Sequence, residues 1–78
     1  MSFVYPNLEK KLSELGLDYR DLAHVIGVSE LGTYRRMRGD TDWKLPEVIK
    51  TCEWLNAPNA SQLFERLPHN KTNFQKNQ

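Results

Sequence analysis

The residues best suited to chemistry in this sequence are basic, and several lie close together. Arg35, Arg36 and Arg38 fall within a stretch of four residues, and Arg20 and Lys44 lie on either side of them in the chain. A guanidinium group offers paired N–H donors that match phosphate oxygens and the O6 and N7 acceptors of guanine. The cluster therefore indicates an anion-binding surface, although a solvated helix face without a ligand has the same composition.

Other reactive side chains do not form a catalytic or metal-binding pattern. His24 has no acid, nucleophile or further metal ligand near it in sequence, which favours a packing or surface role. Cys52 lies among Val48, Ile49 and Leu55 and is interpreted as a small core residue. No Cys/His grouping has metal-site spacing, and no paired nucleophile and base is present. We therefore expect a protein that is not an enzyme and has no metal or cofactor.

Length and composition fit one small soluble domain. The chain has 78 residues, of which 38% are hydrophobic and 27% charged, and its formal net charge is +1. A domain of this size buries only ~60% of its surface on folding, so we expect neither a large cleft nor a small-molecule ligand. No apolar run approaches the ~18 residues of a membrane span, and the first residues are too polar for a secretory signal. The cytoplasm, with no membrane contact, is the expected location.

The basic cluster must be positioned by short helices. Gly16, Gly27 and Gly39 each follow a periodic segment and are expected to end a helix, while Asp18 and Ser29 are placed to cap the next one. With the apolar spacing, these signals predict helices over residues 7–15, 19–26, 30–38 and 45–55, and a short fifth helix that contains Leu63, Phe64 and Leu67. We expect residues 1–67 to form the folded domain and residues 68–78 to form a polar, flexible tail.

The third helix is expected to present a cationic side to solvent. At about 100° per residue, Thr33 and Met37 lie opposite Arg35 and should pack inward. The outward side then holds Leu31, Gly32, Arg35, Arg36 and Arg38.

The fourth helix is expected to pack on the core through an apolar stripe. That stripe consists of Val48, Ile49, Cys52 and Leu55. Trp43 is expected to plug the base of the preceding loop. Trp54 lies off the stripe, so both packing and a place in a subunit interface stay open.

Several short runs together are typical of one known family. Asp21-Leu22-Ala23 and Gly27-Val28-Ser29, followed by Arg35 and Gly39, resemble the core signature of the phage Cro and repressor (Xre-type) helix-turn-helix family. The resemblance covers about residues 5–67.

The flanking segments extend this resemblance. Tyr5-Pro6-Asn7-Leu8 and Trp43-Lys44-Leu45 are similar to the corresponding segments of small prophage-encoded members. The chain departs from the family pattern at Thr33, where Val or Ile is usual. It also has Tyr19 where the family commonly has a phosphate-binding Gln.

The resemblance implies an all-α, compact five-helix bundle of the lambda-repressor-like DNA-binding type. It further implies a sequence-specific transcriptional regulator, a phage or prophage repressor or Cro-like protein, whose third helix enters the major groove of double-stranded DNA. A homodimer on two half-sites is expected because one helix reads only a few base pairs. The family's base contacts fall on Glu30, Leu31, Tyr34 and Arg35. Its phosphate contacts fall on Tyr19, Arg20, Arg36, Arg38 and Lys44.

Two alternatives stay open. Glu30 could accept a hydrogen bond from a cytosine amino group, or it could simply stabilise the amino end of its helix. In addition, the near-neutral charge, the leading Glu30 and Leu31, and Tyr19 in place of Gln also fit a protein-binding module. Such a module, an antirepressor or inhibitor with a protein partner, would keep the fold without reading DNA.

Overall fold

The computed structural model describes residues 3–67, and the tail expected over residues 68–78 lies outside this range. Within it the chain is all-α, and no helix there is long and apolar enough to cross a membrane. The five helices of residues 3–67 are α1 (Pro6–Glu14), α2 (Tyr19–Ile26), α3 (Glu30–Arg38), α4 (Leu45–Trp54) and α5 (Ala60–Leu63). The predicted all-α fold with five helices is confirmed.

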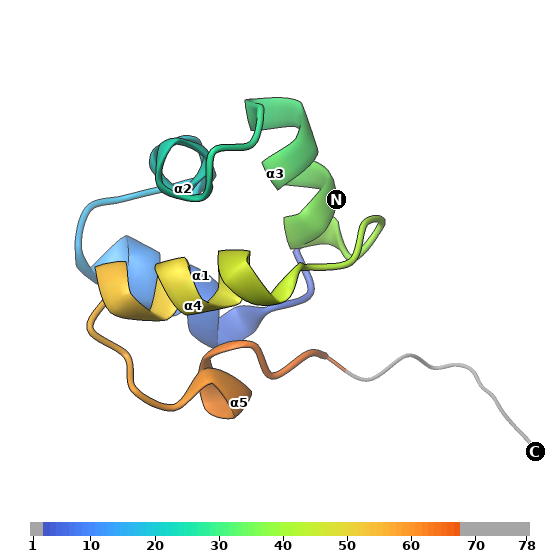
Figure 1. The fold of residues 1–78 in the computed structure, drawn as a ribbon. Helices are drawn as coiled ribbons and strands as arrows, with labels where there is room; N and C mark the ends of the chain where they lie inside the picture. The colour runs from blue at the N-terminus through green and yellow to red at the C-terminus, as the bar shows by residue number, and fades with distance from the viewer. Residues whose placement is uncertain (1–2, 68–78) are drawn as a thin grey trace, which may run out of the picture.

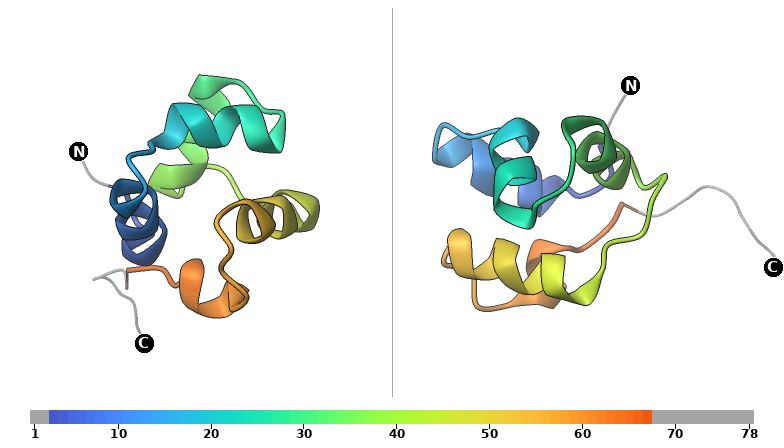
Figure 2. Two further views of the ribbon diagram at one scale, coloured as in Figure 1. Left: turned by 90° about the vertical axis from the view of Figure 1, so that its left-hand side faces the viewer. Right: turned by 45° about the horizontal axis from the view of Figure 1, so that its top comes forward.

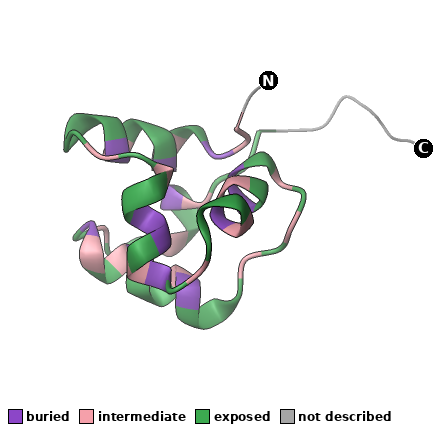
Figure 3. Cartoon of the chain, turned by 90° about the horizontal axis from the view of Figure 1, so that it is seen from above, coloured by how far each residue is buried: buried purple, intermediate pink, exposed green. Residues whose placement is uncertain are grey.

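The helices surround one apolar core. α2 and α3 lie at one end of the molecule and α5 at the other, with α1 and α4 on either side between them (Figure 1, Figure 2). Buried residues occupy the sides of the helices that face one another (Figure 3). The core cluster consists of Tyr5, Leu8, Leu12, Leu22, Ile26, Met37, Leu55 and Leu63.

Local capping sets the starts of α2 and α3, and Gly27 forms the turn between the two helices. Asp18 and Asp21 form a reciprocal box at the start of α2, in which the backbone N–H of Asp18 donates to Oδ2 of Asp21 at 3.0 Å. At the start of α3, Oγ of Ser29 accepts from the backbone N–H of Gly32 at 3.0 Å. Gly27 lies between them with φ of 70°, a left-handed conformation that side chains disfavour. The predicted caps and turn are confirmed.

The end of the described chain differs from the prediction. α5 ends at Leu63, and Leu67 lies outside it and is exposed. The chain leaves the helix to run beside the amino-terminal segment, where the backbone N–H of Leu67 donates to the carbonyl of Val4 at 2.8 Å. The N–H of Val4 in turn donates to the carbonyl of Met37 at 3.0 Å. Residues near both ends of the described range therefore brace the carboxyl end of α3.

Both tryptophans pack against the core. The ring centroid of Trp43 lies 6.2 Å from that of Tyr5 and 4.9 Å from that of Phe64, which confirms its predicted place at the base of the loop. Trp54 is half-buried against the core cluster. This position favours packing over a role in a subunit interface.

The side of α4 that packs inward differs from the predicted stripe. Leu55 is buried and Cys52 packs half-buried against the core cluster, as predicted, but Ile49 is 48% exposed. The buried side of the helix carries Glu47 and Thr51 instead. The prediction is wrong for Ile49, because the inward side of α4 is taken by Glu47, whose carboxylate makes a contact with α3.

That contact is a buried ion pair between Arg36 of α3 and Glu47. Nε and Nη2 of Arg36 donate to the two carboxylate oxygens of Glu47 at 2.9 and 3.1 Å, and Nη1 donates to the carbonyl of Gly32 at 3.1 Å. Oε1 of Glu47 also accepts from the backbone N–H of Lys44 at 3.0 Å. Both charged residues are only 8% exposed. The outward position predicted for Arg36 is therefore wrong, because its guanidinium group is engaged inside the protein.

The ion pair controls the ionisation of Glu47. Burial by itself raises the pKa of this carboxyl, but hydrogen bonds from Arg36 and from the backbone of Lys44, together with their positive charges, outweigh it. The pKa of Glu47 consequently lies below its ordinary value.

Loss of the pair should be costly. Arg36→Ala should lower the free energy of unfolding by about 3–5 kcal/mol, because it leaves the Glu47 carboxylate buried without its partner. Arg38→Ala is the matched control, since Arg38 is largely exposed and its Nε lies 3.5 Å from Asp40. Exposed pairs of this kind contribute about 0–1 kcal/mol. Urea denaturation measures both variants, and similar losses in the two would contradict a structural role for the buried pair.

The stabilisation that the Arg36–Glu47 pair provides should also depend on pH. An unfolded glutamate has a pKa of about 4.3, whereas folded Glu47 titrates lower, so the stabilisation is present above that value and is lost as the pH falls through the folded pKa. Glu47→Gln removes this titration. The difference in unfolding free energy between wild type and Glu47→Gln, measured by urea denaturation from about pH 7 to about pH 3, should therefore shrink. A difference that stays constant across this range would contradict the lowered pKa of Glu47 as a source of stability.

Candidate nucleic-acid interface

α3 contacts the core through a narrow strip. Thr33 and Met37 are fully buried, as the helical spacing predicts. Oγ1 of Thr33 donates to the backbone carbonyl of Ser29 at 2.9 Å, so the buried hydroxyl is satisfied within its own helix. Further support for α3 comes from its two flanks.

An aromatic brace, formed by Phe3, Tyr19 and Tyr34, supports one flank of α3. The Tyr34 ring centroid lies 5.5 Å from that of Phe3 and 5.4 Å from that of Tyr19, and the latter two are 6.0 Å apart. Tilted and edge-to-face pairs at such separations contribute about 0.5–1.5 kcal/mol each beyond their burial. The ion pair of Arg36 supports the other flank, so α3 is held from both sides.

The outward side of α3 lies between these supports. Leu31, Arg35 and Arg38 follow one another at helical spacing, and all three are exposed, as predicted. The guanidinium group of Arg38 lies beside the carboxylate of Asp40, at the 3.5 Å given above, which partly neutralises it. Arg35 is the central basic residue of this side.

The start of α2 adds a second basic residue near the start of α3. The guanidinium carbon of Arg20 lies 5.8 Å from the ring centroid of Tyr19. Contacts with Tyr19, followed by the negative charges of Asp18 and Glu30, raise the pKa of Arg20. The carboxylate of Glu30, the first residue of α3, is thus among the charges that act on Arg20.

The residues predicted to contact DNA fall into separate groups. On the exposed surface of α3 lie Glu30, Leu31, Arg35 and Arg38. At the start of α2 and in the aromatic brace lie Tyr19, Arg20 and Tyr34. Lys44 is exposed just before α4 and is linked to α3 through the carboxylate of Glu47. Arg36 belongs to none of these groups because it is buried.

Sequence reasoning did not single out Phe3. Its ring completes the aromatic brace, and the neighbouring Val4 is bonded to the end of α3. The apolar run Phe3-Val4-Tyr5 directly before Pro6 is the signal that marks this segment as packed. The amino-terminal segment is therefore part of the support of α3.

The remaining reactive groups do not alter this picture. No three His, Cys, Asp or Glu side chains in residues 3–67 are placed to hold a metal ion together. Burial raises the pKa of the Cys52 thiol, which favours its protonated form.

Comparison of the chain with protein-family models, curated proteins and solved structures gives no match. The exposed side of α3 is the feature from which we infer function.

The first turn of α3 should tolerate a side chain at Gly32 poorly. A Cβ atom there would lie 2.7 Å from Cγ1 of Val28 and 3.1 Å from Oγ of Ser29. Gly→Ala usually stabilises a helix by about 1 kcal/mol, but overpacking against a stiff β-branched side chain costs about 1–3 kcal/mol. We expect Gly32→Ala to lower the unfolding free energy by up to about 2 kcal/mol. Val28→Ala in the same chain should recover part of this loss.

A double-mutant cycle by urea denaturation measures this coupling. Strictly additive effects of the Gly32 and Val28 substitutions would show that the two positions do not collide. Favourable coupling between them is the expected result.

Proposed function

We propose that this protein is a helix-turn-helix regulator that binds double-stranded DNA with α3 in the major groove. The proposal is supported by two short helices, α2 and α3, joined by a tight turn at Gly27, which are the parts that such a motif requires. The observation that carries the proposal is the outward side of α3, where Leu31, Arg35 and Arg38 are exposed while both flanks are fixed. A helix held in this way can enter a groove without reorganisation.

Arg35 is proposed as the main base-reading residue. Its guanidinium fork can donate to O6 and N7 of guanine, a pairing that discriminates by ~1–3 kcal/mol. Leu31, one turn earlier, could contact a thymine methyl group, and Glu30 could accept from a cytosine amino group. Tyr34 is assigned a positioning role in place of a base contact, because its ring packs in the aromatic brace.

Phosphate contacts are assigned to Arg20, Arg38 and Lys44, with Tyr19 as a hydroxyl donor. Arg36 is withdrawn from this set because Glu47 holds it in the interior. Each neutralised phosphate adds about 0.9 to the salt slope of binding, so three cationic contacts predict a slope of about 2.7 per copy.

The resemblance to Xre-type proteins supports a proposal about the biological role. It points to a transcriptional regulator of the phage repressor or Cro type that acts as a homodimer on two half-sites.

A second candidate is a protein-binding module without duplex affinity. The exposed Leu31 and the acidic Glu30 near Arg20 favour it, because an apolar side chain beside mixed charges also suits a protein surface.

Substitutions at the proposed interface should have distinct effects. In sequences selected from a random duplex pool, Arg35→Ala should relax the preference at one base position per half-site. Lys44→Ala should instead weaken binding to all duplexes alike and reduce the salt slope by about 1. Fluorescence anisotropy at several salt concentrations measures the affinity and the salt slope, and the selected sequences give the base preference.

Lys10→Ala is the matched control, because Lys10 is exposed on α1 beside the α5 segment rather than near α3. It should leave the affinity and the salt slope unchanged. Identical consequences from the Arg35 and Lys44 substitutions would contradict their separate roles. Absence of duplex binding by wild type at low salt would favour the protein-binding module.

A further inference from the structure

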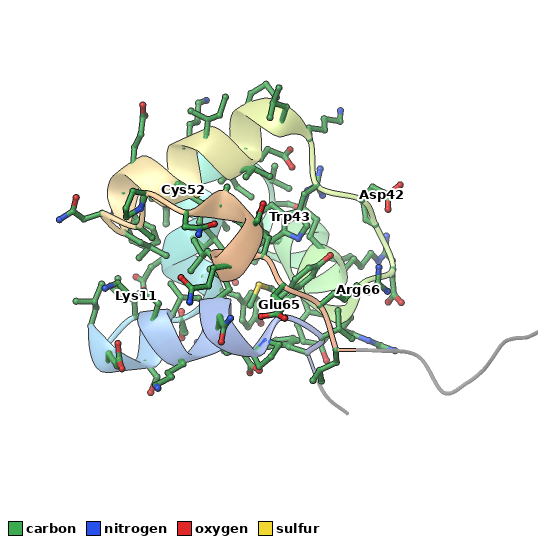
Figure 4. All side chains as sticks on the ribbon, turned by 90° about the horizontal axis from the view of Figure 1, so that it is seen from below. Lys11, Asp42, Trp43, Cys52, Glu65 and Arg66 are labelled. Carbon is green, nitrogen blue, oxygen red and sulfur yellow. The ribbon has the colours of Figure 1, made fainter. Side chains whose placement is uncertain are left out.

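An apolar groove runs along α4. We call it the α4 groove, and its lining includes Leu45, Ile49, Cys52, Ala57, Pro58 and Ala60. Figure 4 shows Cys52 where α4 meets the segment that leads into α5. Glu47, on the other side of α4, is paired with Arg36 of α3. The groove is therefore directed away from α3.

The two ends of the groove differ in side-chain size. Leu45 and Ile49, which share one face at a spacing of four residues, are 71% and 48% exposed. They form an apolar ridge at the end near the start of α4. The other end is lined mainly by the small or compact side chains Cys52, Ala57, Pro58 and Ala60. One surface thus carries both a ridge and a hollow.

We propose that the α4 groove is the surface through which two copies of this chain associate. In a two-fold symmetric contact the same patch occurs on both subunits, so it must complement itself. With the two α4 helices antiparallel, the Leu45–Ile49 ridge of each copy enters the small-residue end of the groove on the other copy. This packing removes from water the apolar stripe that the fold leaves uncovered.

The charges beside the groove fit the same arrangement. Lys50 and Glu53 lie one turn apart on the exposed side of α4. A two-fold axis between them reverses their order, so that Lys50 of each copy faces Glu53 of the second copy. A parallel arrangement in register would instead bring like charges together, which is unfavourable. The charge pattern therefore favours a second, antiparallel copy as the occupant.

This association does not rest on DNA binding by α3. Because the groove is directed away from α3, the pairing leaves the outward sides of both α3 helices accessible. It can be measured in the absence of any nucleic acid. A dimer that fails to bind duplexes would contradict the proposed function and leave the dimer surface intact.

Sedimentation of the full chain over about 5–500 µM, without DNA, tests the proposal. Wild type should show a reversible monomer–dimer equilibrium. Ile49→Glu should weaken it at least about tenfold, because it places two carboxylates in the apolar contact. Leu15→Glu is the matched control, since Leu15 has a similar exposure of 52% and lies outside the groove. It should leave the equilibrium unchanged.

Charge reversal tests the antiparallel register. Lys50→Glu and Glu53→Lys should each weaken association, and the double variant should restore it toward the wild-type value. Circular dichroism of every variant checks that the helices remain formed. A wild type that stays monomeric at all concentrations would overturn the proposal and leave a different protein as the occupant. A dimer insensitive to Ile49→Glu would equally overturn it, because the interface would then lie elsewhere.

Discussion

The buried pairing of Arg36 with Glu47 ties α3 to α4 and fixes one flank of α3. α3 offers the core a narrow strip that contains Thr33 and Met37, and Tyr34 of the aromatic brace supports its other flank. The bidentate contact adds a directional constraint from α4, and the same carboxylate holds the start of α4 through the backbone of Lys44. A buried ion pair gains little net stability over an apolar pair, but its geometry is specific. With Arg36 held inside, Arg35 and Arg38 lie on the outward side of α3, and Ile49 lies on the exposed side of α4.

Local signals predicted much of the fold. Asp18, Ser29, Gly27 and Gly39 act through their immediate neighbours, and the bounds of α2 and α3 followed from them. The errors share one cause, which is contact between residues far apart in sequence. Helical spacing assigned Arg36 outward because its partner, eleven residues away, lies on another helix and leaves no trace in the periodicity of α3. It likewise placed Ile49 in the core and extended the fifth helix to a residue that pairs with Val4.

In the candidate site, too, some features followed from local helix geometry and others depend on contacts between distant segments. The exposed positions of Arg35 and Arg38 followed from helix geometry, whereas the support of α3 by Phe3 depends on the amino-terminal segment folding back against it.

The burial of Arg36 also reduces the number of cationic side chains available to bind a polyanion. In a chain with a net charge of only +1, two copies acting together would double the phosphate contacts and give useful affinity from few basic residues. The proposed groove on α4 would provide that pairing.

Backbone amide chemical shifts test the proposed role of α3 most directly. The ¹⁵N-labelled chain would be titrated at low salt with a short duplex of mixed sequence. DNA binding by the outward side of α3 predicts the largest shifts at residues 30–38 and at the start of α2, with α1 nearly unaffected. Shifts that are absent from α3, or that are confined to the α4 groove, would contradict it.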